Sequence, residues 1–317
     1  MSYYELDKEY VLNTYKRIPL DVAKGDGGYL FDTEGNKYLD MFSGIAVLHL
    51  GHNDQGLKDA MINQINKYAH LSNYFASEPV VELAKKLVEN SFAKKVFFAN
   101  SGTEANEGAL KLAVKWGKEI NINKTEIIST LNGFHGRTTG ALALTGQPGK
   151  QEPFSSILPA VKYINYNSIE NLKAAVNENT CAIFLEAIQG EGGIIELDIE
   201  FVKELHALRD KYNFLIIMDE IQAGLGRTAS ELFAYEAYGV NPDLVTLAKG
   251  IGGGLPLGAI LIPEKLETGA FQLYKFIAGN LTWPLMVGLG MLYVPIKDVA
   301  AIISLPYVLT CVAIVTS

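Results

Sequence analysis

The sequence predicts an α/β fold in which helices flank a mostly parallel sheet. Short apolar runs alternate with helical patterns through the middle of the chain, and this alternation favours a parallel sheet. Polar residues follow the ends of several apolar runs, as Asp219 and Glu220 follow residues 214–218. In sheets of this kind, binding sites lie outside the carboxyl ends of the strands. At 317 residues, the chain is long enough to bury a sizeable core around such a sheet.

Residues 1–50 are expected to form a small N-terminal segment that contains a β-hairpin. Two short runs, at 29–32 and 37–40, flank the turn-rich tetrapeptide Thr33-Glu34-Gly35-Asn36. The segment is expected to pack over a larger domain that spans residues 51–271.

Periodicity predicts the elements of this larger domain in order. Residues 80–88 carry apolar side chains at helical spacing, and residues 95–100 then predict a strand. Residues 103–118 predict an amphipathic helix that begins at the Ser101-Gly102-Thr103 turn. Further strands are expected at 126–130, 181–186, 214–219 and 244–248, and further helices at 169–177 and 199–212.

Composition and charge argue against several classes of protein. The net charge is -8 with acids and bases interspersed, so the chain offers no basic face and no nucleic acid partner is expected. Two cysteines, and histidines that lack metal-ligand spacing, suggest neither a disulfide framework nor a metal site. Residues 1–17 are polar, unlike a secretory signal peptide, so cytoplasmic localisation is the expectation.

The pair formed by Asp219 and Lys249 is the most informative feature of the chain. Asp219 closes an apolar run, and Lys249 follows thirty positions later in a small, apolar setting before the glycine-rich residues 250–254. An isolated lysine at a strand end is more often simply solvated. An acid that pairs with a pyridinium nitrogen and a lysine that binds the aldehyde are, however, how proteins hold pyridoxal phosphate. The pair therefore predicts a pyridoxal phosphate site.

Ser101-Gly102-Thr103 is a candidate phosphate site. At a helix N-terminus, free backbone N–H groups, a hydroxyl and the positive end of the helix dipole suit a phosphate dianion. An ordinary N-cap is the alternative, because serine and threonine are favoured there with an acid three residues on, as Glu104 is here. The other motifs favour the phosphate interpretation.

Five motifs in order make the chain resemble the class III pyridoxal-phosphate-dependent aminotransferases, and most of all the acetylornithine aminotransferases. The motifs are Asn100-Ser101-Gly102-Thr103-Glu104-Ala105-Asn106, Gly133-Phe134-His135-Gly136-Arg137-Thr138, Glu186-Ala187-Ile188-Gln189-Gly190-Glu191-Gly192-Gly193, Asp219-Glu220-Ile221-Gln222-Ala223-Gly224 and the Lys249 segment. The resemblance extends from near Tyr10 to near Phe271. It implies the fold of the fold type I pyridoxal-phosphate-dependent transferases.

The resemblance also implies roles for residues outside the Asp219 and Lys249 pair. Phe134 is expected to stack on the cofactor ring, with His135 beside it, and Gln222 to lie near the phenolic oxygen of the cofactor. Arg137 is expected to grip a substrate carboxylate, although an arginine seen alone is as often a surface residue. Glu191 is expected to help exchange the two substrates by pairing with an arginine near the C-terminus, for which this sequence shows no counterpart.

Transamination in two half-reactions is the activity that the resemblance implies. N2-acetylornithine would donate its δ-amine, 2-oxoglutarate would accept it, and the pathway would be arginine biosynthesis. Ornithine and 4-aminobutyrate aminotransferases share much of the motif set and stay as alternatives. Members of the family are dimers whose sites are completed by a loop of the partner subunit, so a homodimer is expected.

The resemblance stops after Phe271, and residues 272–317 form an apolar tail in which Lys297 and Asp298 are the only charged residues after position 280. One hypothesis is therefore that this chain is a truncated or frame-altered aminotransferase with impaired activity. Another is that residues 299–317 are a membrane anchor. Pro306, the polar residues of this stretch and the lack of a flanking basic cluster argue against the anchor.

Overall fold

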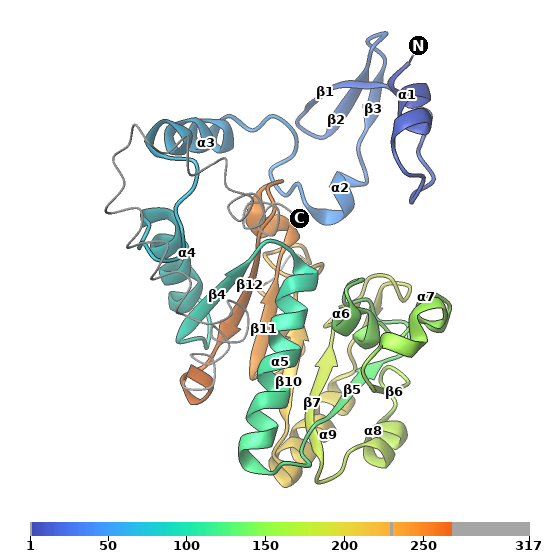
Figure 1. Ribbon diagram of the computed structural model, residues 1–317, viewed down its shortest axis with the longest axis vertical. Helices are drawn as coiled ribbons and strands as arrows, with labels where there is room; N and C mark the ends of the chain where they lie inside the picture. The colour runs from blue at the N-terminus through green and yellow to red at the C-terminus, as the bar shows by residue number, and fades with distance from the viewer. Residues whose placement is uncertain (1, 229–230, 268–317) are drawn as a thin grey trace, which may run out of the picture. The chain divides into compact units, whose positions relative to one another are not determined.

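The structure, a computed structural model, describes residues 2–228 and 231–267 (Figure 1). The apolar tail expected at residues 272–317 lies outside the described residues. Within the described part, no helix is both long enough and apolar enough to cross a membrane.

The N-terminal fifty residues form helix α1 (Tyr3–Tyr10), three antiparallel strands and the short helix α2 (Ser43–Ala46). Strands β2 (Tyr29–Asp32) and β3 (Lys37–Leu39) pair as the expected hairpin. Asp32 stabilises its turn, because Oδ1 accepts from the backbone N–H groups of Glu34 and Asn36 at 2.9 and 2.8 Å. Strand β1 (Val22–Asp26), which periodicity does not predict, pairs with the other side of β2.

A seven-stranded sheet forms the centre of the fold in the order β4-β12-β11-β10-β7-β5-β6. The strands are β4 (Lys95–Ala99), β5 (Glu126–Thr130), β6 (Lys162–Ile164), β7 (Thr180–Leu185), β10 (Leu215–Asp219), β11 (Leu244–Leu247) and β12 (Gly258–Ile262). The five strands expected in this domain are all present, and no bound differs from the expected one by more than one residue. Strands β6 and β12 were not expected.

Strand β12 is antiparallel to both of its neighbours, β11 and β4, whereas the other pairs of the sheet are parallel. Only ten residues separate the end of β11 from the start of β12. A parallel pair needs a crossover of a dozen or more residues, so this connection returns the chain antiparallel. The predicted mostly parallel sheet is confirmed, with β12 as its exception.

The helices that flank the sheet include all four that periodicity predicts. They are α4 (Glu78–Glu89), α5 (Gly102–Ile120), α8 (Ile169–Ala175) and α9 (Ile199–Tyr212). The structure adds α3 (Gln55–Lys67) and the short helices α6 (Thr139–Leu144), α7 (Pro148–Gln151) and α10 (Ala234–Ala237). A two-stranded ribbon, β8 (Ile188–Gln189) with β9 (Ile195–Glu196), and two 3-10 turns, Glu152–Ile157 and Lys249–Gly252, complete the described elements.

The core lies on both faces of the sheet. All six residues of β7 are buried. Because successive side chains of a strand point to opposite faces, a strand buried throughout is covered on both faces. On one face, Ile183 and Leu185 share a cluster with Phe201 and Leu205 of α9. Helix α5 packs along β7, β11 and β12, and is seen lengthwise against the sheet in Figure 1. Burial of each large aliphatic side chain stabilises the fold by about 1.5–3 kcal/mol, so the sheet is a rigid base for the loops at its ends.

Candidate functional site

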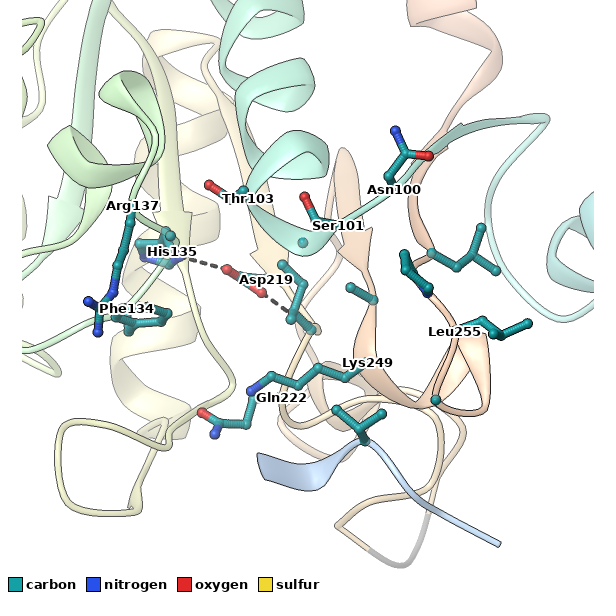
Figure 2. A pocket seen from close by; sticks show the side chains of 18 of the residues that line it. Asn100, Ser101, Thr103, Phe134, His135, Arg137, Asp219, Gln222, Lys249 and Leu255 are labelled. Atoms are coloured by element: carbon teal, nitrogen blue, oxygen red, sulfur yellow. Dashed lines mark hydrogen bonds and ion pairs between the residues drawn. The ribbon is translucent and has the colours of Figure 1, made fainter. Parts of the chain in front are cut away.

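A cavity of about 500 Å³ lies where several strands end. Nine of the ten residues expected in the site line it, namely Ser101, Gly102, Thr103, Phe134, His135, Arg137, Asp219, Gln222 and Lys249. Figure 2 shows their side chains around one space, although they come from segments up to 148 positions apart. The fold therefore brings together the residues that the sequence motifs single out, with the exception of Glu191.

Asp219 ends the fully buried strand β10 and is itself only 4% exposed. Its Oδ2 accepts hydrogen bonds from Asn106 Nδ2 and interacts with His135 Nδ1, each at 2.8 Å. Its Oδ1 accepts from the backbone N–H of Ile221 at 3.0 Å. Because hydrogen bonds to a carboxylate favour its charged form, this shell supports a negative charge that burial alone would oppose.

His135 is buried beside this carboxylate, with its ring edge-on to Phe184. Burial lowers the pKa of His135, but the hydrogen bond that His135 donates to Asp219 and the negative charge of Asp219 outweigh burial and raise the pKa above its usual value. Nε2 is buried and has no hydrogen-bond partner. His135 thus donates its Nδ1 proton to Asp219, and the rest of its ring packs against Phe184.

Lys249 follows β11 at the start of a 3-10 turn, and its side chain extends into the cavity (Figure 2). Burial lowers the pKa of its amine, against the opposing charges of Asp219, Glu191 and Glu186. Its backbone φ is +51°, in the left-handed region that a non-glycine residue rarely occupies. Strain of this kind costs about 1–3 kcal/mol and collects at functional sites.

Ser101 is the N-cap of α5, and its Oγ accepts from the backbone N–H of Glu104. The Glu104 carboxylate in turn accepts from the backbone N–H of Asn100, the residue before the N-cap, at 2.7 Å. The ordinary N-cap interpretation therefore describes the side chains correctly. The first-turn amides of Gly102 and Thr103 still face no intrahelical acceptor, so they stay available to an anion in the cavity.

The loop that carries Arg137 is tied to the start of α5 by threonines. Thr103 Oγ1 lies 2.9 Å from Thr138 Oγ1, and Thr138 Oγ1 donates to Glu107 at 2.6 Å. Between them, Gly136 has a φ of +133°, and a Cβ there would meet the Thr103 side chain, 2.7 Å from its Cβ. Only glycine allows this approach of loop and helix.

Gly136→Ala is therefore expected to destabilise the protein by about 1–3 kcal/mol, because it combines a left-handed backbone with overpacking. Urea unfolding measures the change. Gly149→Ala is the matched control, since a Cβ at Gly149 meets nothing within 4 Å and its φ is not in the left-handed region. Equal midpoints for the two variants would contradict the packing argument.

Glu186 is a buried acid on the wall of the cavity, 4% exposed, just beyond the end of β7. Its Oε2 accepts from the backbone N–H of Phe134 at 3.1 Å, so it holds the segment that presents the Phe134 ring. Burial raises the pKa of Glu186 from its ordinary 4.5 to about 7. The group is thus half-ionised near neutral pH.

Glu186→Gln is expected to change how stability depends on pH. Because the folded-state pKa is raised, the contribution of Glu186 is fully present below pH 4.5 and is lost as pH rises through about 7. A shift of this size corresponds to about 3 kcal/mol. Urea unfolding at pH 5 and pH 8 should therefore show the variant gaining stability relative to the parent at pH 8. Glu89→Gln, at a 58% exposed side chain, is the control, and parallel pH curves for all three proteins would refute the expectation.

Arg137 lines the cavity with its guanidinium 5.8 Å from the centre of the Tyr15 ring. Tyr15 lines the same cavity, so the N-terminal segment contributes to the site. Gln222 lies one turn beyond Asp219 and also faces the cavity (Figure 2). An exposed arginine at the rim of the cavity, beside an aromatic ring, is suited to bind a carboxylate.

Glu191 does not line this cavity. It lines a neighbouring one of about 460 Å³, where its carboxylate pairs with Lys150 Nζ at 3.3 Å. The Lys150 ammonium also lies 4.8 Å from the centre of the Phe134 ring. In the described residues, a lysine thus pairs with Glu191, whereas the resemblance implies an arginine near the C-terminus.

Sequence reasoning missed three residues of the site. Asn106 and Glu186 stood in quoted motifs, but only the structure shows that they contact Asp219 and Phe134. Tyr15 carried no signal. Glu220, the residue after Asp219, is buried and accepts from the N–H groups of Ala234 and Tyr235 at 2.7 and 2.9 Å. Glu220 thus caps α10, because the first N–H groups of a helix have no acceptor within the helix.

Comparison with protein families agrees with the extent of the resemblance. The aminotransferase class-III model matches residues 10–273, close to the limits expected from the motifs. The model of the 2-hydroxycarboxylate transporter family matches residues 258–317, and residues 268–317 of this match lie outside the described part.

Curated relatives carry two activities. The acetylornithine aminotransferase of Caldanaerobacter subterraneus is 49% identical over 259 residues, covering 81% of this chain and 66% of the relative. The succinylornithine transaminase of Photorhabdus laumondii is 44% identical over 260 residues, covering 82% and 64%. The chain thus spans about two thirds of the length of these relatives.

Solved structures share the fold. An ornithine aminotransferase from Toxoplasma gondii matches with a TM-score of 0.79 and 30% identity, covering 84% of this chain and 63% of that one. An N-acetylornithine aminotransferase from Stenotrophomonas maltophilia matches with a TM-score of 0.70 and 37% identity, covering 84% and 66%. The fold type I prediction is confirmed by these neighbours. With a family model that matches most of its length, the chain belongs to the aminotransferase class-III family.

Proposed function

We propose that this chain catalyses pyridoxal-phosphate-dependent transamination, with N2-acetylornithine as amino donor and 2-oxoglutarate as acceptor, in arginine biosynthesis. The observation that carries the proposal is one cavity that holds a lysine amine of lowered pKa and a buried carboxylate, Lys249 and Asp219. The proposal includes a homodimer, as the family resemblance implies, in the cytoplasm.

The residues present fit pyridoxal phosphate. The first-turn amides of Gly102 and Thr103, with the helix dipole behind them, suit the phosphate. Asp219 suits a protonated ring nitrogen, Phe134 offers an aromatic face, and Lys249 supplies the amine that binds an aldehyde. The structure of the Toxoplasma gondii relative is described with partial occupancy of PLP at its active site, which supports the same assignment. Bound pyridoxal phosphate supplies an electron sink for the carbon that carries the donor amine.

Lys249 acts as acid and base in this proposal. Burial lowers its pKa, so a larger fraction of the amine is neutral than in a solvated lysine. The neutral Nζ could remove the proton from the amine-bearing carbon of the donor and deliver it to the carbon of the cofactor that had carried the aldehyde. Asp219 supplies a buried carboxylate to the site, and Phe134 and the buried His135 line the cavity with it.

Arg137 orients the donor. Its guanidinium is held between Tyr15 and the cavity, where it can grip the α-carboxylate with two parallel hydrogen bonds. The δ-amine of the donor would then extend toward Lys249. Correct placement of this kind is a large part of enzymatic rate enhancement.

The choice of donor rests on the relatives. Acetylornithine aminotransferases match at 44–49% identity, and succinylornithine transaminases at 42–44%. Ornithine aminotransferases appear among the structural neighbours at 30–32% identity. This ranking supports an N2-acylated ornithine, and acetyl before succinyl.

A donor comparison tests the proposal. The full chain, supplied with pyridoxal phosphate and 2-oxoglutarate, is assayed for glutamate with N2-acetylornithine, N2-succinylornithine, ornithine and 4-aminobutyrate in parallel. The highest kcat/KM is expected with N2-acetylornithine. A higher value with another donor would replace the substrate but keep the reaction. No glutamate with any donor, despite bound cofactor, would support the hypothesis of an impaired chain.

A further inference from the structure

Asn106 connects three parts of the site wall from within helix α5. It is fully buried. Its Nδ2 donates to Asp219 Oδ2 at 2.8 Å and to the backbone carbonyl of His135 at 2.7 Å, and its Oδ1 accepts from Thr246 Oγ1 at 2.8 Å. One amide thus joins α5, the loop after β5 and the ends of strands β10 and β11.

The orientation of this amide follows from its acceptors. The carbonyl of His135 can only accept, and Asp219 as a carboxylate can only accept. A flipped amide would place Oδ1 against both oxygens, which repel it, so Nδ2 must face them. The Thr246 hydroxyl then donates to Oδ1, the acceptor of the amide. This hydrogen bond agrees with the orientation but is not needed to choose it.

The consequence falls on Asp219. Its Oδ2 receives donors from Asn106 and His135, and its Oδ1 receives the backbone N–H of Ile221. These donors occupy both oxygens of a carboxylate that is 4% exposed, so they fix its position at the end of β10. The other charged groups that act on this unit are Glu186 and Glu220, which disfavour a further negative charge, and Lys249, which favours it.

We propose that Asn106 is a positioning residue that holds the Asp219 carboxylate in place and oriented toward the ring nitrogen of the cofactor. The proposal rests on the proposed function, because it assigns Asp219 to that nitrogen. Asn106 acts through Asp219 and touches neither cofactor nor substrate.

Two variants separate positioning from structure. Asn106→Leu keeps the volume and removes both donors to Asp219 and His135. Thr246→Val also removes one buried hydrogen bond of the same network but leaves both Nδ2 donors in place. Titration of the full-length proteins with pyridoxal phosphate, followed by absorbance, is expected to show at least about tenfold weaker binding for Asn106→Leu, the factor expected when a hydrogen bond to a charged group is lost. Thr246→Val is expected to weaken binding less.

A measurement without cofactor tests the same idea. The side-chain ¹⁵N signals of His135 in the cofactor-free protein report its protonation. When Asp219 loses the Asn106 donor, its charge holds the imidazolium more strongly, so the titration midpoint of His135 is expected to rise in Asn106→Leu and to move less in Thr246→Val.

The two measurements give distinguishable outcomes. Equal effects of both variants on affinity and on the His135 midpoint would overturn the proposal, because any lost buried hydrogen bond would then suffice. A His135 midpoint that does not rise in Asn106→Leu would overturn it as well. If the parent protein binds no pyridoxal phosphate, the proposed function fails, while the His135 measurement still decides whether Asn106 controls Asp219.

Discussion

Replacing Lys249 with alanine is expected to remove both the covalent attachment of pyridoxal phosphate and the turnover of N2-acetylornithine. Loss of the proton-transferring amine alone is expected to lower kcat by about 10²–10⁴-fold. The lysine also stands in a strained backbone conformation in a buried setting, which the rest of the fold has to sustain. Alanine meets the same backbone strain at this position as lysine does, so removing the amine should leave the fold intact.

Visible absorbance and glutamate formation measure this loss. The parent protein with pyridoxal phosphate should show an absorbance band of the covalently bound cofactor, and the Lys249→Ala protein should not. Lys249→Arg is the control, because it keeps a positive charge but cannot bind the aldehyde covalently. An active Lys249→Arg protein would show that charge, and not the amine, is what the site uses.

Asp219→Asn is expected to have the second largest effect, about 10²–10³-fold in kcat, as when a single preorganised electrostatic group is removed from a buried site. Asparagine keeps the shape of the side chain but removes the negative charge that favours a protonated ring nitrogen. It also removes the charge that raises the pKa of His135, so that pKa should fall.

Glu220→Gln is the matched control for Asp219→Asn. Glu220 is the next residue, is equally buried, and caps α10 without lining the cavity. Burial raises the pKa of Glu220 to about 8, so its replacement should change stability with pH but leave cofactor affinity close to that of the parent. Cofactor titration of both variants decides the matter, and equal losses of affinity would deny Asp219 a specific role.

The sequence predicted the central elements well because their signals are local. The run before Asp219 and the runs at β5, β7 and β11 are apolar and short, and all became buried strands. The helical pattern of residues 103–118 became α5 with its small residues on the buried side. Strand β12 was missed because the glycine-rich segment before it gives no periodic signal, and its direction depends on the length of that connection.

By itself, the sequence determined the family, the extent of the resemblance and nine of the residues that line the cavity, because motif order and residue type are properties of the chain alone. Only the tertiary structure decided which side chains share a cavity. It placed Tyr15 beside Arg137, separated Glu191 with Lys150 from the other residues, and joined Asn106 to Asp219 across 113 positions. These contacts depend on how strands and helices pack, and long-range packing leaves no signature in the local pattern of a single sequence.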